Sequence, residues 1–352
     1  MENTAITWCH HTFNGWEGCT KVSPGCAHCY AETRNARFNR GTASNWGPGA
    51  PRRRTSPKTW GKVRKWNHEA QALRQAWEER LAWAEAHGDA FDEPAPERPR
   101  VFVSSLSDWL DPEVSLEWLL DLLHVVYSNR HLDFLLLTKR PGLWRERLEQ
   151  ALHWQAKHDP LDAQRPGMYA FLANWLGEMG GPTSFRPPNV WAMTSVEDQP
   201  RAEERIPALL EIPAVVHGLS CEPLLGALNL RHVSWIHSGG RTIIDALTGH
   251  MSHAIDGYRP VWPRIDWVIV GGESGHCARP MQPDWARSLR DQCAATGVAF
   301  HFKQWGEWAP QPEATAPYFD GLDVPPRLLR AGKHAAGRLL DGVEHHAFPR
   351  VQ

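Results

Sequence analysis

Residues 18–30 of the chain read GCTKVSPGCAHCY and place three cysteines, Cys19, Cys26 and Cys29, in the spacing Cys-x6-Cys-x2-Cys. The glycines and the proline between them favour a loop, and such a loop can wrap around a compact group. The pair Cys26 and Cys29 can bring two thiolates to one metal ion or to one edge of an iron–sulfur cluster. The stretch therefore predicts a metal centre with three cysteine ligands.

Spacing alone leaves two kinds of centre open. Structural zinc takes four protein ligands, and the candidates for a fourth are Cys9, His10, His11 and His28. This alternative describes a zinc-stabilised nucleic-acid-binding protein without catalysis. A [4Fe–4S] cluster held by only three cysteines would instead leave one iron free to bind a small molecule.

The flanking residues carry a family resemblance. The segment 8–32, with Thr12-Phe13-Asn14 before the loop and Cys29-Tyr30-Ala31-Glu32 at its end, resembles the opening of a phage-associated three-cysteine-motif family of unknown function. That family is similar to the radical S-adenosylmethionine (SAM) superfamily, whose usual loop is Cys-x3-Cys-x2-Cys, and the resemblance extends to about Trp308.

The resemblance implies an enzyme. In it, Cys19, Cys26 and Cys29 hold a [4Fe–4S] cluster whose open iron binds SAM. One electron passed through the cluster cleaves SAM and starts radical chemistry on a substrate that is not identified, with a nucleic acid as one candidate. The implied partners are SAM and a small one-electron donor such as flavodoxin.

Six apolar runs follow along the chain, at 101–103, 133–137, 190–193, 214–219, 267–270 and 298–302. Continuous apolar runs are typical of strands buried on both faces, as in a parallel sheet. Helices are predicted at 29–38, 67–87, 200–211 and 283–296 and from Pro112 onward, and a first strand at 6–8. The pattern predicts an α/β fold with a complete or partial parallel β/α barrel of about six or seven units, like a TIM barrel or a radical SAM enzyme.

Each of the six runs ends in polar residues. In β/α barrels the functional groups lie at the carboxyl ends of the strands, so these residues are expected to meet the cysteine loop at one rim. Glu273, Glu197 and Glu222 are suited to the ammonium or ribose of SAM, and Lys139 to its carboxylate or to a substrate phosphate. The predicted SAM-binding residues are Ser105, Asp108, Thr138, Lys139, Ser195, Glu197, Glu222, Gly271, Gly272, Glu273 and Ser274.

The barrel is predicted to span residues 1–308, with insertions at about 40–66, 150–188 and 228–264 and a peripheral extension at 309–352. From Arg52 to Lys65 the basic residues occur without an acid, and Trp46, Trp60 and Trp66 are interleaved or adjacent. Such a stretch can neutralise phosphates and stack on bases, so it is a candidate nucleic-acid contact. The insertion at 228–264 contains His232, His237, His250 and His253, and we expect a lid or surface loop there.

The composition favours a cytoplasmic protein. The chain has 352 residues, a formal charge of −2 and seven cysteines, too few and too scattered for a disulfide framework. Its start lacks the basic and apolar regions of a signal peptide. No apolar run reaches the roughly 18 residues that a membrane span needs. We therefore expect no membrane partner.

Overall fold

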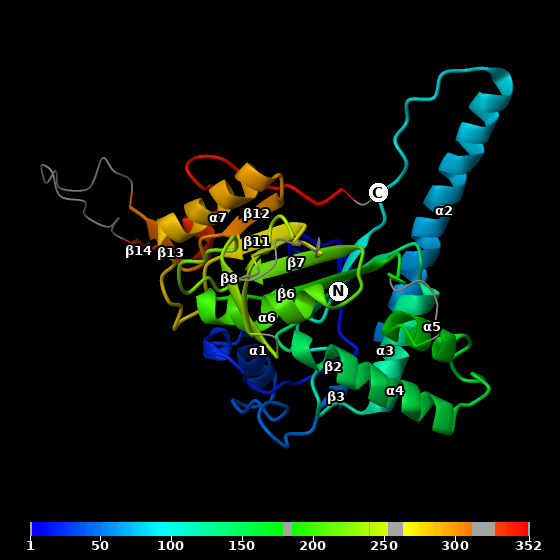
Figure 1. Cartoon of the computed structure of the whole chain (residues 1–352), viewed down its shortest axis with the longest axis horizontal. Coiled ribbons are helices and arrows are strands. Elements are labelled where there is room, and N and C mark those ends of the chain that lie inside the picture. The colour runs from blue at the N-terminus through cyan, green and yellow to red at the C-terminus, as the bar shows by residue number, and fades with distance from the viewer. Residues whose placement is uncertain (1, 179–184, 239, 253–262, 312–327, 351–352) are drawn as a thin grey trace, which may run out of the picture.

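A computed structural model describes residues 2–178, 185–238, 240–252, 263–311 and 328–350. Within them, seven strands form one curled, entirely parallel sheet, a half-barrel with the order β1-β4-β5-β6-β7-β11-β12 (Figure 1). These strands are β1 (His11–Phe13), β4 (Arg100–Val103), β5 (Asp133–Thr138), β6 (Val190–Ser195), β7 (Val216–Cys221), β11 (Trp267–Gly271) and β12 (Ala299–Gln304).

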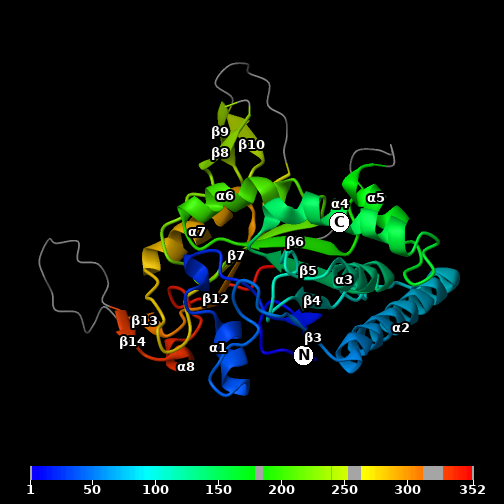
Figure 2. The ribbon, with the colours of Figure 1, turned by 90° about the horizontal axis from the view of Figure 1, so that it is seen from below.

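Helices cover the outer face of the sheet (Figure 2). They are α3 (Leu116–Ser128), α4 (Trp144–His158), α5 (Met168–Leu176), α6 (Gln199–Leu210) and α7 (Pro283–Thr296). Side chains alternate along each strand. Val101 and Val103 of β4 therefore join the core under the helices, whereas Phe102 joins the inner cluster. This double burial explains why the strands appear as unbroken apolar runs.

The prediction of a partial parallel β/α barrel is confirmed, since all six apolar runs form strands of the sheet. The prediction for the first strand is wrong, because it lies at His11–Phe13 and pairs with β4. Trp8, placed in that strand by its sequence, instead turns into the barrel, 4.6 Å from the ring of Phe102. The indole gains more from burial there than in an edge strand.

An aromatic layer fills the inside of the half-barrel. The ring of Trp267 meets those of Trp191 and Trp8 edge-on, at centroid distances of 5.8 and 6.3 Å. The layer consists of Trp8, Cys9, Phe102, Leu135, Trp191, Met193, Val216, Trp267 and Ile269, all buried. The interior is thus a packed core, as in closed β/α barrels.

The C-terminal residues lie along the open edge of the sheet at β12. Phe302 N donates to His345 O at 3.0 Å, and Ala347 N donates to Phe300 O at 3.2 Å. Phe348 then packs against the aromatic layer, with the guanidinium of Arg100 3.9 Å from its ring centroid. The described part of the extension, expected at the periphery, therefore contacts the interior of the barrel.

The helix after the basic stretch begins earlier than predicted. It is α2 (Pro57–His87), with proline in its first turn, so the 40–66 insertion is irregular only in its first part. Its far half projects from the body (Figure 1). The next helix begins later than predicted, at Leu116, where Ser115 Oγ accepts from Trp118 N at 3.3 Å. Asp111, the predicted cap, is fully buried and pairs with Arg52.

The remaining elements are short and lie around this body. The insertion at 150–188 holds the end of α4 and α5, and that at 228–264 holds an antiparallel sheet of three strands. His232, His237 and His250 lie in or beside that sheet, and His253 lies outside the described residues. These elements are β2 (Trp16–Glu17), β3 (Arg53–Arg54), β8 (Val233–His237), β9 (Gly240–Asp245), β10 (His250–Ser252), β13 (Trp308–Pro310), β14 (Leu328–Arg330), α1 (Tyr30–Phe38), α8 (Lys333–Ala336) and the 3-10 turns η1 (Pro24–Cys26) and η2 (Pro141–Leu143). Among the described residues, every helix is too short or too polar to span a lipid bilayer.

Candidate metal centre on the barrel rim

The cysteine loop lies over the carboxyl ends of the parallel strands. It enters beside the end of β4, where Gly18 N donates to Leu106 O at 3.1 Å. Nearby, Asn14 Nδ2 at the end of β1 lies 3.0 Å from Ser105 Oγ. Three further anchors, from the ends of β5, β6 and β11, then hold the loop along its length.

The first anchor is Arg140, which follows β5. Its Nη1 lies 3.6 Å from Cys19 Sγ, and its Nη2 donates to Thr20 O at 2.8 Å. Asp108 fixes the guanidinium at 3.0 Å and also accepts from Thr138 Oγ1 at 2.7 Å and from Lys139 N at 2.9 Å. Asp108 and Thr138, predicted to contact SAM, thus form the network that positions the first cysteine.

The second anchor is Glu197, which follows β6. Its carboxylate is 1% exposed and accepts from Gly25 N at 3.2 Å and from Arg205 Nη1 at 3.0 Å. A Cβ atom on Gly25 would lie 3.0 Å from the carboxyl carbon of Glu197. A side chain on residue 25 would therefore force the carboxylate of Glu197 or the loop to shift.

The third anchor is Glu273, which follows β11. It accepts from Arg279 Nη2 at 2.6 Å and lies 3.2 Å from His28 Nδ1, while Arg279 donates to Pro24 O at 3.0 Å. Burial by itself would raise the pKa of Glu273, but the hydrogen bonds from Arg279 and His28 lower it below its usual value. Glu273 is therefore an ionised clamp between the cysteine loop and the sheet.

Close packing explains why two glycines precede Glu273. A Cβ atom on Gly272 would lie 1.9 Å from Trp305 O, and one on Gly306 would lie 2.2 Å from Glu273 O. The backbones that follow β11 and β12 therefore cross in contact. At Gly271, a Cβ atom would lie 3.3 Å from the carboxyl carbon of Glu222.

Polar side chains line the inner side of the rim above the aromatic layer. Lys139 Nζ donates to Ser195 Oγ at 2.8 Å, and Lys303 Nζ pairs with Glu222 at 2.6 Å. Gln304 Nε2 connects Glu222, at 3.2 Å, to Ser274, at 3.0 Å. Lys139 has no carboxylate within ion-pair distance in the part of the chain that the structure describes.

The environment of the thiols combines burial with nearby cations. Burial raises the pKa of Cys19 to about 12, with the charge of Asp108 acting in the same direction and Arg140 opposing it. Burial also raises the pKa of Cys29, where the neighbouring Cys26 adds to the effect and Lys139 opposes it. A bound metal that replaces the thiol protons would relieve this cost, and the two cations would balance the resulting charge.

A single zinc ion and a four-iron cluster require different arrangements of the ligand side chains. Over the described ranges, no three His, Cys, Asp or Glu side chains converge on a site for one ion. A single zinc needs four donors at about 2.0–2.3 Å, whereas a four-iron cluster distributes its cysteines over separate irons. Cys9 is 6% exposed and lies in the aromatic layer, where burial raises its pKa to about 12. Cys9 is thus packed among the rings of the barrel interior, and its role as a fourth zinc ligand stays a prediction.

Three consecutive arginines of the basic stretch are paired with acids. Arg52 pairs with Asp111 at 2.8 Å, Arg53 with Glu17, and Arg54 with Asp121 at 2.6 Å. Its tryptophans also pack against other rings, since Trp66 is buried against the ring of His11 and Trp60 packs on Phe13. The acids come from distant parts of the chain, so these three arginines are paired. Lys58 and Arg64 of the same stretch are exposed, and nucleic-acid contact by the stretch stays a prediction.

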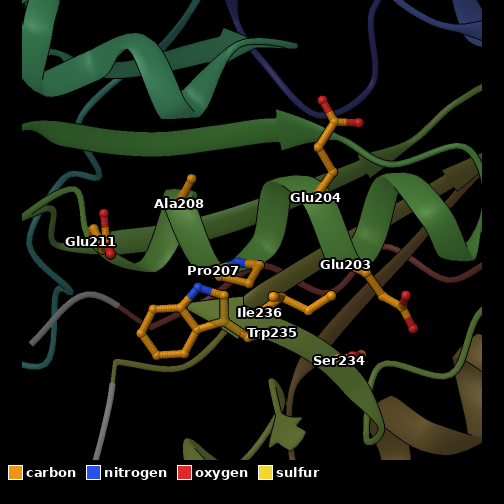
Figure 3. A pocket seen from close by; sticks show the side chains of 8 residues that line it. All are labelled: Glu203, Glu204, Pro207, Ala208, Glu211, Ser234, Trp235 and Ile236. Carbon is orange, nitrogen blue, oxygen red and sulfur yellow. The ribbon is translucent and has the colours of Figure 1, made fainter. Parts of the chain in front are cut away.

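A hollow of about 430 Å³ lies elsewhere, between α6 and β8 on the outer side of the sheet (Figure 3). None of its lining residues belongs to the rim. They are Glu203, Glu204, Pro207, Ala208, Glu211, Ser234, Trp235 and Ile236.

Fold and site together define a parallel half-barrel protein with a cysteine loop clamped on its carboxyl rim. Residues 3–349 match the family described as Protein of unknown function (DUF5131), and the chain belongs to that family. Searches of curated proteins and of solved structures gave no match.

Proposed function

We propose that this protein is a radical-SAM-type enzyme in which Cys19, Cys26 and Cys29 hold a [4Fe–4S] cluster. The observation that supports it most is the clamping of the cysteine loop to the ends of β5, β6 and β11 by Arg140, Glu197 and Glu273. In a parallel β/α barrel this rim is where catalytic groups lie.

The residues present fit such a group. The three thiols come from one loop and are half-buried, with Arg140 beside Cys19 and the charge of Lys139 acting on Cys29. Thiolate ligands with surrounding hydrogen bonds and positive charge are the usual means of holding and tuning an iron–sulfur cluster. When bound, the cluster would supply the electron that cleaves SAM.

The inner rim offers groups for both charged ends of SAM. Lys139, which lacks a carboxylate partner among the described residues, is suited to the carboxylate of the ligand. Glu222 is 20% exposed and can accept from the ammonium or ribose hydroxyls, with Lys303 and Gln304 holding it in place. The aromatic layer below excludes water from the reacting end, which protects radical chemistry.

Anaerobic reconstitution with iron and sulfide tests this proposal. We expect a brown protein with about four irons per chain, and cleavage of SAM to 5′-deoxyadenosine when dithionite is added. Cys29→Ala should abolish both, whereas Cys9→Ala should keep both because Cys9 lies in the aromatic layer. A colourless protein with one tightly bound zinc, lost equally in the two variants, would reject the proposal.

A further inference from the structure

The helix that follows the cysteine loop carries two aromatic rings in solvent. Tyr30 and Phe38 are each 70% exposed. With Arg34 they stand at positions i, i+4 and i+8 of α1, so all three lie on one side of the helix. Tyr30 directly follows Cys29, and this aromatic face therefore begins at the proposed cluster.

Cations accompany the two rings. The guanidinium of Arg34 lies 5.1 Å from the ring centroid of Phe38, and Arg37 and Arg40 are exposed. Glu32 is the one acid in α1, and it is paired with Lys21 at 2.7 Å. Arg34 shares a single carboxylate, Glu17, with Arg53. Positive charge is therefore in excess along the face.

Single exposed apolar side chains need no explanation in a folded protein. Here, however, two rings share one side of a nine-residue helix with arginines. Aromatic rings that stack on bases, combined with guanidinium groups that neutralise phosphates, are how proteins hold single-stranded nucleic acid. A duplex would not suit the rings, because its bases are already stacked.

The geometry of α1 fits several nucleotides. At 1.5 Å per residue, the Cα atoms of Tyr30 and Phe38 are about 12 Å apart along the helix axis. That is several times the ~3.4 Å between stacked bases. The rings would therefore contact bases that are not adjacent, with the exposed Arg37 available to the backbone between them.

We propose that the α1 face, made of Tyr30, Arg34, Arg37 and Phe38, binds single-stranded nucleic acid and leads it to the cysteine loop. That this strand is the substrate rests on the function proposed above, whereas the binding itself does not. The surface differs from the 52–65 stretch, whose three consecutive arginines pair with Asp111, Glu17 and Asp121.

Fluorescence anisotropy tests the proposal with the reconstituted full-length protein and a fluorescein-labelled single strand of about twenty nucleotides, as DNA and as RNA. We expect Tyr30→Ala/Phe38→Ala to weaken binding by roughly 10- to 100-fold. Arg37→Glu should weaken binding and lower the salt slope, measured between about 50 and 200 mM salt, by about one or two. The matched controls are Trp83→Ala and Arg64→Glu, an exposed ring and an exposed cation on α2.

Equal affinity of the α1 variants and the native protein would overturn the proposal. So would equal losses in the α2 controls, equal affinity for a duplex, or equal competition by a polyglutamate peptide, which carries charge but no bases. Iron content and SAM cleavage are measured on the same samples. Strand binding by a protein without a cluster would keep this proposal and reject the enzymatic one, and a cluster without strand binding would do the reverse.

Discussion

The inside of the half-barrel and its rim are made by the same strands, but they are held together differently. Inside, Trp8, Trp191 and Trp267 pack edge to face and are almost completely buried. At the rim, acidic residues that follow the strands form ion pairs, and most of these pairs hold the cysteine loop. The acids are Asp108, Glu197, Glu222 and Glu273. The inside therefore stabilises the fold, and the rim positions one loop.

This difference predicts that changes in the two regions separate stability from metal binding. Losing a ring inside should lower the free energy of unfolding without altering the loop. Losing an anchor at the rim should loosen the loop, with a cost to folding only where a buried charge is left unpaired. The following experiments test that separation.

Trp191→Ala should have the largest effect on folding. Trp191 is 2% exposed, and truncating a buried indole leaves a cavity in the aromatic layer. We expect the free energy of unfolding to fall by about 3–5 kcal/mol, measured by urea denaturation. The fraction that remains folded should bind iron normally. A loss of iron binding in that fraction would contradict the separation of stability from metal binding.

Arg205→Met should cost about 3 kcal/mol, because it leaves the carboxylate of Glu197 buried without its cation. The matched control is Arg201→Met on the same helix, which removes the more exposed pair with Asp198 and should cost under about 1 kcal/mol. Arg205→Met should also reduce iron content. Equal losses of stability in the two variants would contradict the role given to the buried pair.

His301 should make the free energy of unfolding depend on pH in the acid range. Burial, with the charges of His346 and Lys303, lowers its pKa to about 4, and its Nε2 lies 2.9 Å from Thr7 Oγ1. In the unfolded chain the pKa of His301 is near 6.5, so acid protonates His301 there before it does so in the folded protein. Stability should therefore be complete above about pH 6.5 and fall by about 2–3 kcal/mol toward pH 4. His301→Gln should flatten this dependence in urea titrations, and an unchanged slope would contradict the assignment.

Gly25→Ala should have the smallest effect on folding, about 1 kcal/mol or less, because residue 25 lies in a surface loop. Its Cβ atom, 3.0 Å from the carboxyl carbon of Glu197, should nevertheless displace the loop and lower iron content after reconstitution. Gly142→Ala, at a turn with nothing within 4 Å of the added atom, is the control and should bind iron fully. Equal iron in both variants would show that the anchor at Glu197 does not matter.

Much of the fold was predictable because it depends on local patterns. Strands buried on both faces appear as apolar runs, and the polar residues that follow each run mark the rim. The first strand was placed at the wrong residues because β1 begins with His11, while the apolar Trp8 before it turns into the barrel. The continuation of the tail into the interior at Phe348 leaves no periodic signal.

The site was predictable in its residue types but not in its pairings. Glu197 and Glu273 follow apolar runs and were recognisable as rim residues, yet nothing local shows that they face Gly25 and His28. Arg205 and Arg279 were missed for the same reason, since an arginine on a helix or in a loop is common. The partners of the 52–54 arginines are Asp111, Glu17 and Asp121, which lie far away in sequence. Arginines that are paired in the fold therefore looked unpaired in the sequence.

In the proposed function, the three cysteines of the anchored loop hold a cluster with one iron open to a ligand. Electron paramagnetic resonance of the reduced, reconstituted protein, recorded with and without SAM, tests this most directly. We predict an iron–sulfur signal that changes when SAM is added and is absent in Cys19→Ala, Cys26→Ala and Cys29→Ala. A signal that SAM leaves unchanged, or stoichiometric zinc with no signal, would contradict the account.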